Sequence, residues 1–438
     1  MPTALDAACV PENIANPSEA KLYARVTLRL IPFLFLCYVF AYLDRVNVGF
    51  AKLQMLDELH FSETVYGLGA GIFFFGYFIF EVPSNMMLHK VGARKWIARI
   101  MISWGVISAC MVFVQTPTMF YVLRFFLGVA EAGFFPGIIL YLTYWFPSSR
   151  RGKITAMFLT GIPMAGVLGG PLSGWIMSTT HGWHGYSAWQ WLFALEAIPS
   201  IVAGIAVLVY LRDNPDDAKW LSADEKATLK RNLEAEGGQD HSHQSALSAF
   251  RNARVWLLSL GYFGVMMGLN GITFWLPSLI KNTGIQSTAT VSLLTTIPYA
   301  CATIAMIMTG RHSDARRERR WHAAIPAVLG ALGLVLATFT EQSPVMTVAF
   351  LSLGAMGVMT AMSQFWCYPP AFLGGIAAAA GIAMINSIGN LAGFISPYLI
   401  GWVKDATGST SIALYCIAVA LVCAAVVCLS LPKAVVNR

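Results

Sequence analysis

The chain has 438 residues, of which 57% are hydrophobic and only 12% are charged. This composition excludes an ordinary soluble globular protein, in which about a quarter of the residues are charged, and it indicates a protein that crosses a membrane many times. The formal net charge of +7 follows from basic loops on one side of the membrane, as argued below, so it gives no support to nucleic-acid binding.

Apolar stretches of about 20 residues, the length that crosses a bilayer, recur along the whole chain. They predict roughly twelve transmembrane helices, six on each side of one polar break. The predicted fold class is therefore all-α integral membrane, with two pseudo-symmetric six-helix bundles. The predicted spans are 26 to 48, 64 to 88, 95 to 114, 118 to 146, 153 to 178, 189 to 211, 254 to 280, 287 to 310, 322 to 340, 345 to 368, 374 to 403 and 411 to 431.

The spans divide the chain into five predicted regions. They are a cytoplasmic tail over 1–25, a first bundle over 26–211, a cytoplasmic linker over 212–253, a second bundle over 254–431 and a cytoplasmic tail over 432–438. The first tail contains no apolar segment of the kind found in a signal peptide, so the first span is expected to act as the insertion signal.

The first span carries an Asp-Arg pair, Asp44 and Arg45. Ionisable side chains within a bilayer are costly unless they line a wet, partnered cavity, so they are functional candidates. Tyr42 shares a helix face with Arg45, and Tyr77 lies midway along the second span. Each tyrosine can donate its hydroxyl to substrate oxygen atoms. The alternative for the Asp-Arg pair is a fixed salt bridge between helices.

The fourth span carries Arg124 and Glu131. Seven residues are two helical turns, so both side chains project from one face, about 10 Å apart along the axis. Arginine keeps its proton and matches a carboxylate with a planar fork of donors, so Arg45 and Arg124 are predicted to clamp an organic anion. A carboxyl group is neutral or charged according to its partners, so Asp44 and Glu131 are predicted to couple transport to protons.

Three further groups have predicted roles. Glu81, near the end of the second span, is expected to pair with a basic gate residue, and Glu196 in the sixth span is assigned a structural or gating role. Basic loops follow the second and eighth spans, and the residues expected to form a gate are Lys90, Gly92, Arg94, Asp314 and Glu81.

The longest polar segment runs from Arg212 to Arg251. Within it Ser222 and Glu225 have the spacing of a capping box, which predicts a short surface helix. Most Lys and Arg residues fall in this linker, in the tails and in loops on the same side. Since cytoplasmic loops hold back positive charge, both termini are predicted to be cytoplasmic. The sequence also has no Asn-x-Ser/Thr site, which favours a bacterial inner membrane.

Polar side chains also occur within the second half. Ser363 and Trp366 are three residues apart, and Asn386 and Asn390 are four apart, so each pair shares a helix face. They are predicted to contact the substrate from the opposite wall. The alternative is that these groups only hold helices together through interhelical hydrogen bonds.

The two halves look like duplicates. At a shift of about 225 residues Gly174 and Trp175 fall on Gly401 and Trp402, and Asp44 falls on Asn270. Repeat-built transporters place their substrate at the interface of the repeats, near the middle of the membrane. The predicted site is therefore charged on one wall and neutral on the other.

At these residues the chain resembles the major facilitator superfamily and, more narrowly, its anion:cation symporter family. The matching strings are Tyr42-Leu-Asp44-Arg45-Val-Asn47, Glu81-Val-Pro-Ser-Asn85, Arg124-Phe-Phe-Leu-Gly128-Val-Ala-Glu131-Ala-Gly133-Phe-Phe-Pro136-Gly137 and Trp189-Gln190-Trp191. The resemblance implies uptake of a small organic carboxylate, such as a sugar acid, tartrate, phthalate or hydroxyphenylacetate, by proton symport with alternating access. His89 stands where the wider superfamily has an acidic residue.

Other functions remain open at this point. An exchanger or uniporter of the same anions would use the same arginines, and a membrane sensor is a further alternative. An enzyme is excluded because the spans contain no Ser-His-Asp spacing or metal cluster. We therefore expect no catalytic residue, no cofactor and no metal, and a monomer whose partners are the anion, protons and the lipid bilayer.

Overall fold

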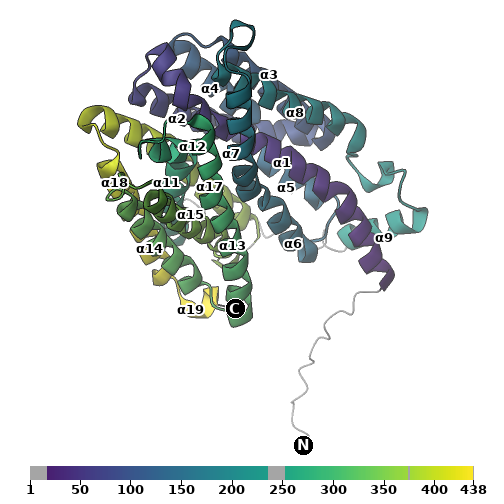
Figure 1. Ribbon diagram of the computed structural model, residues 1–438. Coiled ribbons are helices and arrows are strands. Elements are labelled where there is room, and N and C mark those ends of the chain that lie inside the picture. Colours follow the sequence, from purple (N-terminus) through teal and green to yellow (C-terminus); the bar gives the residue numbers. More distant parts are fainter. Residues whose placement is uncertain (1–16, 235–251, 373–374, 438) are drawn as a thin grey trace, which may run out of the picture.

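The computed structural model describes residues 17–234, 252–372 and 375–437. In these residues every regular element is a helix, and Figure 1 shows the helices gathered into two bundles that lie side by side. The predicted tail over 1–25 and the linker over 212–253 are therefore only partly described. The helices of the first half are α1 Pro17–Leu59, α2 Glu63–Val91, α3 Ala93–Cys110, α4 Pro117–Glu131, α5 Phe134–Thr143, α6 Ser148–Leu159, α7 Gly161–Thr179 and α8 Ala188–Tyr210.

The second half repeats this plan. Its helices are α11 Ala253–Lys281, α12 Thr288–Leu294, α13 Thr296–Arg316, α14 Arg320–Ala337, α15 Pro344–Phe365, α16 Pro369–Phe372, α17 Gly375–Thr407, α18 Ser411–Ser430 and α19 Lys433–Val436. Between the halves α2 packs against α17, and α7 packs against α12 and α13. At the predicted shift of about 225 residues, α2 of the first half corresponds to α12 and α13 of the second half, and α7 corresponds to α17. The contact of α2 with α17 and the contact of α7 with α12 and α13 are therefore related by the repeat.

Eleven segments of the described chain are long and apolar enough to cross a membrane. They coincide with all the predicted spans except 153 to 178, which consists of the end of α6 and nearly all of α7. The helix is interrupted at Thr160. The remaining helix, α7, has 19 residues and no charged side chain, but its many glycine and proline residues lower its hydropathy, so it is not among the eleven. The all-helical fold class with two bundles is confirmed.

The fourth predicted span is broken into α4 and α5. Gly133 takes a left-handed conformation with φ of 86°, and a Cβ atom there would lie 2.4 Å from the hydroxyl oxygen of Ser84. Three residues later Pro136 has no backbone N–H with which to continue the helix. The break makes Glu131 the last residue of α4, beside the first half's inner surface.

The described part of the linker contains α9, Ala223–Glu234. The predicted capping box is confirmed: the Ser222 N–H donates to the Glu225 carboxylate at 2.9 Å, and the Glu225 N–H donates to the Ser222 hydroxyl at 3.3 Å. Arg25 of α1 then donates to Glu225 at 2.7 Å. This contact holds the linker helix against the first helix of its own half.

The halves are joined at the side where α1 turns into α2. Glu63 binds Lys52 at 2.6 Å and Lys404 at 2.5 Å, and the Asp405 carboxylate accepts the N–H groups of Glu63 and Thr64 at 3.1 and 2.7 Å. We call Lys52, Glu63, Lys404 and Asp405 the latch. Next to it a Cβ atom on Gly67 would lie 2.4 Å from the carbonyl oxygen of Pro397, so α2 and α17 are in backbone contact there.

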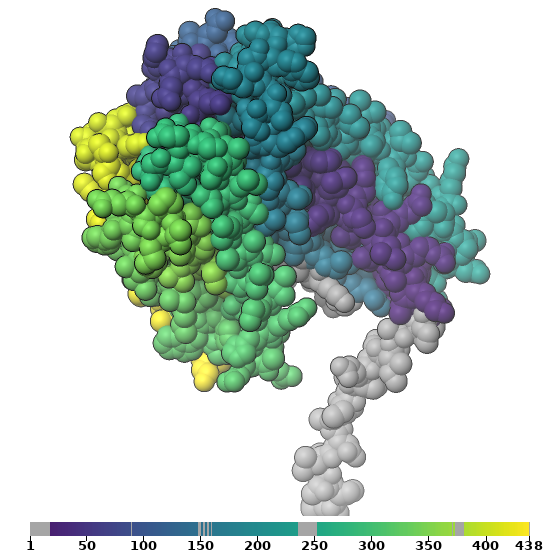
Figure 2. All heavy atoms as spheres, viewed as in Figure 1, coloured from purple at the N-terminus to yellow at the C-terminus, as the bar shows by residue number. Residues whose placement is uncertain are grey.

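Away from the latch the halves diverge. In Figure 2 the two halves touch along α7 and α12 in the upper part of the view, whereas α6 and the end of α13 lie apart below. The structure is therefore closed on the latch side, and the space between the bundles is widest toward the linker side.

Candidate functional site

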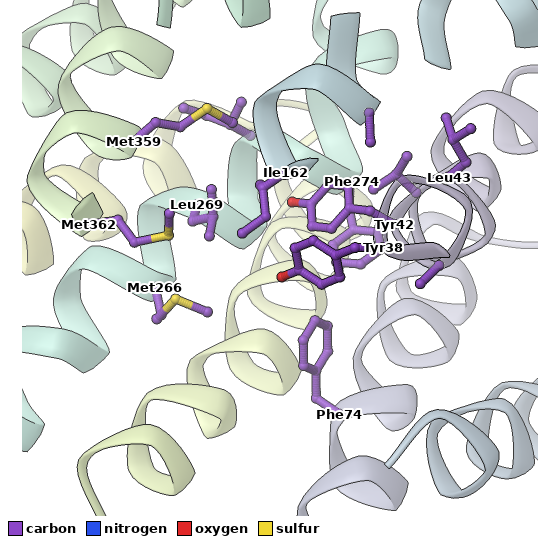
Figure 3. Packing of buried hydrophobic residues seen from close by; sticks show 14 of the residues in the cluster. Tyr38, Tyr42, Leu43, Phe74, Ile162, Met266, Leu269, Phe274, Met359 and Met362 are labelled. Atoms are coloured by element: carbon purple, nitrogen blue, oxygen red, sulfur yellow. The ribbon is translucent and has the colours of Figure 1, made fainter. Parts of the chain in front are cut away.

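A cavity of about 220 Å³ lies between the two bundles. Its first wall comes from α1, α2, α5 and the start of α7, and its second from α11, α13, α15 and α17. Figure 3 shows Tyr38 and Tyr42 pointing from α1 toward Met266 and Met362 of the second half. The lining residues are Tyr38, Tyr42, Arg45, Phe74, Tyr77, Phe135, Thr160, Ile162, Tyr262, Met266, Leu269, Asn270, Thr273, Met306, Met362, Ser363, Trp366, Asn386 and Asn390.

Arg45 is the charged residue of this cavity. Among the described lining residues no other side chain carries a formal charge. Its guanidinium donates a hydrogen bond to Glu131 and lies 5.7 Å from the ring centre of Tyr42 and 5.8 Å from that of Tyr77. The Nε atom of Arg45 is buried without a hydrogen-bond partner. Phe73 lies nearer still, with its ring centre 5.3 Å from the guanidinium. The cation of the cavity is therefore held by a carboxylate and three aromatic rings, and one of its donors is unused.

The neighbouring carboxylate, Asp44, points elsewhere. It accepts hydrogen bonds from Trp104 and Ser108 of α3, each at 3.1 Å, and from Ser200 of α8. Consecutive residues of a helix point about 100° apart, so the cavity-facing position of Arg45 directs Asp44 into the interior of the first bundle. The structure therefore separates the two members of the predicted Asp-Arg pair.

Arg124 also lies outside the cavity lining. It is fully buried, and its guanidinium donates to the carbonyl oxygen atoms of Gly69 at 3.1 Å and Ala70 at 3.4 Å. One terminal nitrogen, Nη1, has no hydrogen-bond partner. The seven-residue spacing correctly places Arg124 and Glu131 on one face of α4. It does not say how far along that face the cavity extends. In this conformation one arginine lines the cavity, whereas two were expected.

The second wall supplies the predicted neutral groups. Ser363, Trp366, Asn386 and Asn390 all line the cavity. Asn386 donates a hydrogen bond of 3.1 Å to Glu81, which joins the two halves across the cavity. The Ser363 hydroxyl, however, donates to the carbonyl oxygen of Thr360 in its own helix.

Sequence reasoning missed several residues of this lining, although their spacing carried a signal. On α11 Tyr262, Met266 and Asn270 recur every four residues, which places them on one helix face. On α1 Tyr38 and Tyr42 have the same spacing. Counting back by four from Asn270 would have found Met266 and Tyr262, and counting back by four from Tyr42 would have found Tyr38.

The residues predicted to form a gate lie on the side opposite the latch. Gly92 takes a φ of 94° between α2 and α3, and the Arg94 N–H donates to the Asp213 carboxylate at 2.8 Å. Asp314 is 3.6 Å from Arg319, and Lys90 is exposed. The partner of this loop is therefore Asp213, at the start of the linker. The side chain of His89 lies outside the described residues.

Comparison with known proteins agrees with this architecture. Residues 34–397 match the model of the Major Facilitator Superfamily. A putative metabolite transport protein of Pseudomonas putida, NicT, is 47% identical over the full length of both chains. A putative tartrate transporter of Agrobacterium vitis is 49% identical, with 95% of each chain covered. Among solved structures a D-xylose-proton symporter superposes with a TM-score of 0.74 at 17% identity, covering 94% of this chain and 99% of the other.

Proposed function

Since the chain belongs to the Major Facilitator Superfamily and is a membrane transporter rather than an enzyme, we propose that it imports a small organic carboxylate by proton symport. The observation that carries this proposal is the position of Arg45, the charged residue of the cavity, whose partner is the carboxylate of Glu131. A relative that is 49% identical is named as a putative tartrate transporter, which supports a hydroxylated acid as the substrate.

The anion is held by Arg45 and by neutral groups around it. A guanidinium binds a carboxylate through two parallel N–H bonds, and the buried Nε of Arg45 has no hydrogen-bond partner in this conformation. Tyr42 and Tyr77 flank Arg45, while Asn386 and Asn390 face it from α17. In this proposal the hydroxyl and amide groups bind the substrate's remaining oxygen atoms, with Ser363 and Trp366 beside them. The clamp contains Arg45 in this conformation, and Arg124 joins it when the outer side opens.

Glu131 and the substrate compete for the same guanidinium. While Glu131 is charged, its contact with Arg45 occupies the fork that the substrate needs. A proton on Glu131 removes the ionic partner and frees Arg45 for the anion. Asp44 interacts electrostatically with Glu131 and is proposed as the second coupling carboxylate. Proton binding and anion binding are coupled because both depend on one arginine.

Alternating access follows from the two sides of the interface. The latch closes one side, which we assign to the outside, and the cavity widens toward the side of Lys90, Gly92, Arg94 and Asp314, which we assign to the cytoplasm. Asn386 and Glu81 join the halves on the cytoplasmic side of the cavity. In this proposal the termini are cytoplasmic and the protein acts as a monomer, and its bacterial relatives support a bacterial inner membrane.

A binding experiment tests the substrate class. Purified transporter is titrated calorimetrically with tartrate, a sugar acid and an aromatic acid, and with the amide of each. At least one acid is expected to bind and its amide to fail, since loss of a charge-assisted pair costs about 2 to 5 kcal/mol. The same acid is expected not to bind an Arg45→Gln variant. Equal binding of acid and amide would contradict an anion site.

A further inference from the structure

The first bundle encloses a polar cluster that is separate from the anion cavity. Its members are Asp44 and Asn47 of α1, Ser173 of α7, and Glu196 and Ser200 of α8, each at most 5% exposed. None of them is among the described residues that line the anion cavity. Ser200, which donates to Asp44, lies one helical turn after Glu196 on the same face of α8, so the two carboxyl groups belong to one cluster.

The partners of the two carboxyl groups are uncharged. Asp44 accepts from Trp104, Ser108 and Ser200, and Glu196 accepts from Ser173 at 2.8 Å. Glu131, by contrast, has an arginine. A buried carboxylate is expensive unless its charge is matched by a partner. The two acids of the cluster are therefore suited to receive a proton.

Three buried atoms of the cluster lack a hydrogen-bond partner. They are Oε2 of Glu196 and both amide atoms of Asn47, although Asn47 lies beside Glu196. Such atoms are rare in folded proteins and call for an explanation. Asn47 can meet either state of this carboxyl group, because its Nδ2 donates to a charged Oε2 and its Oδ1 accepts from a protonated one. The cluster therefore offers a partner for Glu196 both with and without a proton.

A groove leads to the cluster from the latch side. A cavity of about 500 Å³ lies between α7 and α8 over α1, and Glu196 is the charged residue among its described lining residues. The groove extends past Thr179 and Thr180 to Trp183, which lies in the turn between α7 and α8. That turn adjoins the end of α1, because the Ser187 hydroxyl donates to Glu58 at 2.5 Å.

We propose that Glu196, Asp44 and Asn47 form a proton-binding site inside the first bundle, loaded through this groove and separate from the cavity that holds the anion. The site deepens the proposed function and rests on it for its role in transport. A proton from water at the latch-side end of the groove, beside Thr179 and Thr180, binds the Glu196 carboxylate and passes to the Asp44 carboxylate, so that one O–H bond breaks as another forms. Asp44 then acts electrostatically on Glu131 and thereby on the Arg45 pair.

The surroundings of the site include no further titratable group among the contacts given for the described residues. Trp104 and Ser108 of α3 and Ser173 of α7 donate hydrogen bonds to the two carboxyl groups. Glu131 of α4 is the nearby charged group. The pH response of the site is therefore set by three carboxyl groups, Glu196, Asp44 and Glu131, the last held by Arg45.

Infrared spectroscopy tests proton binding directly and without substrate. Difference spectra of the purified full-length transporter are recorded between about pH 6 and alkaline pH, a range in which an ordinary exposed carboxyl group stays ionised, in the region where protonated carboxyl groups absorb. Glu196→Gln is expected to remove one component of that absorption and Ser173→Ala to shift its frequency, since Ser173 donates to the same carboxyl group. Glu341→Gln, an exposed acid in the turn after α14, is the control and is expected to leave the spectrum unchanged. Spectra of both test variants identical to the wild type would overturn the proposal.

A transport assay tests the role of the site in transport. In proteoliposomes Glu196→Gln is expected to lose most of the roughly tenfold accumulation that one pH unit supplies per coupled proton, while Glu341→Gln keeps it. Unchanged accumulation by Glu196→Gln would overturn the role in transport. If the wild type moves an anion without protons, the proposed function fails, whereas the infrared result still decides whether the site binds a proton.

Discussion

Replacement of Glu131 by glutamine is expected to abolish proton-driven accumulation of the anion while counterflow exchange continues. Glutamine keeps the size of the side chain and an oxygen that can accept from Arg45, but it cannot release or bind the coupling proton. Arg45 is then free for the anion at every pH, so the pH gradient no longer drives movement of the anion. With one coupled proton, the wild type gains about tenfold accumulation per unit of pH gradient, and the variant is expected to reach only equal concentrations on both sides.

The measurement is uptake of radiolabelled substrate into proteoliposomes, with and without a pH gradient, and counterflow in the same preparation. Glu131→Asp is the matched variant: it keeps the carboxyl group on a shorter side chain and is expected to retain part of the accumulation. Glu341→Gln controls for loss of an exposed acid. If Glu131→Gln accumulates substrate as the wild type does, Glu131 is not the coupling carboxylate.

Replacement of Arg45 by lysine is expected to abolish anion binding and uptake while the protein still folds. Lysine keeps the positive charge but loses the planar fork that binds a carboxylate through two bonds. The variant also loses the guanidinium's position over Tyr42 and Tyr77. Truncating one partner of a buried charge pair costs about 2 to 5 kcal/mol, and about 1.4 kcal/mol is a factor of ten in affinity, so binding is expected to weaken at least ~30-fold.

Calorimetric titration with the best-bound acid measures this loss, and the melting temperature in detergent reports on folding. Arg25→Lys is the matched control, because Arg25 lies on the same helix but pairs with Glu225 of the linker, outside the cavity. A folded Arg45→Lys variant that binds the acid with wild-type affinity would show that the anion is held elsewhere.

Eleven of the twelve spans predicted from the sequence coincide with described segments that are long and apolar enough to cross a membrane, because the apolar length of a span is a property of local composition. The sequence was less informative about breaks within a span. Gly133 and Pro136 were visible, yet glycine and proline are also tolerated within continuous transmembrane helices. Whether they interrupt the helix depends on the contact between Gly133 and Ser84, which is distant in the sequence.

In the candidate site, too, the sequence predicted local spacing but not contacts between distant helices. Helical spacing correctly grouped Tyr42 with Arg45, and Asn386 with Asn390, on the lining of the cavity. Spacing could not decide which of Asp44 and Arg45 faces the cavity, because that choice is made by Trp104, Ser108 and Ser200 on other helices.

The latch lay beyond sequence reasoning altogether. Glu63 and Lys404 are separated by 341 residues, and neither stands out as a charge within an apolar run, since both lie near the ends of their helices. Ion pairs between the ends of distant helices depend on how the two bundles rest against each other. Only the three-dimensional arrangement brings these residues together.

The most direct test of a proton-coupled anion carrier is the pH inside sealed vesicles. Proteoliposomes loaded with a pH-sensitive dye receive the best-bound acid from outside, with the membrane potential clamped and the entry of label followed in parallel. The account predicts internal acidification that rises with anion entry in the wild type and is absent in Glu131→Gln. Entry of the anion into wild-type vesicles at constant internal pH would contradict proton symport and leave exchange or uniport of the same anion.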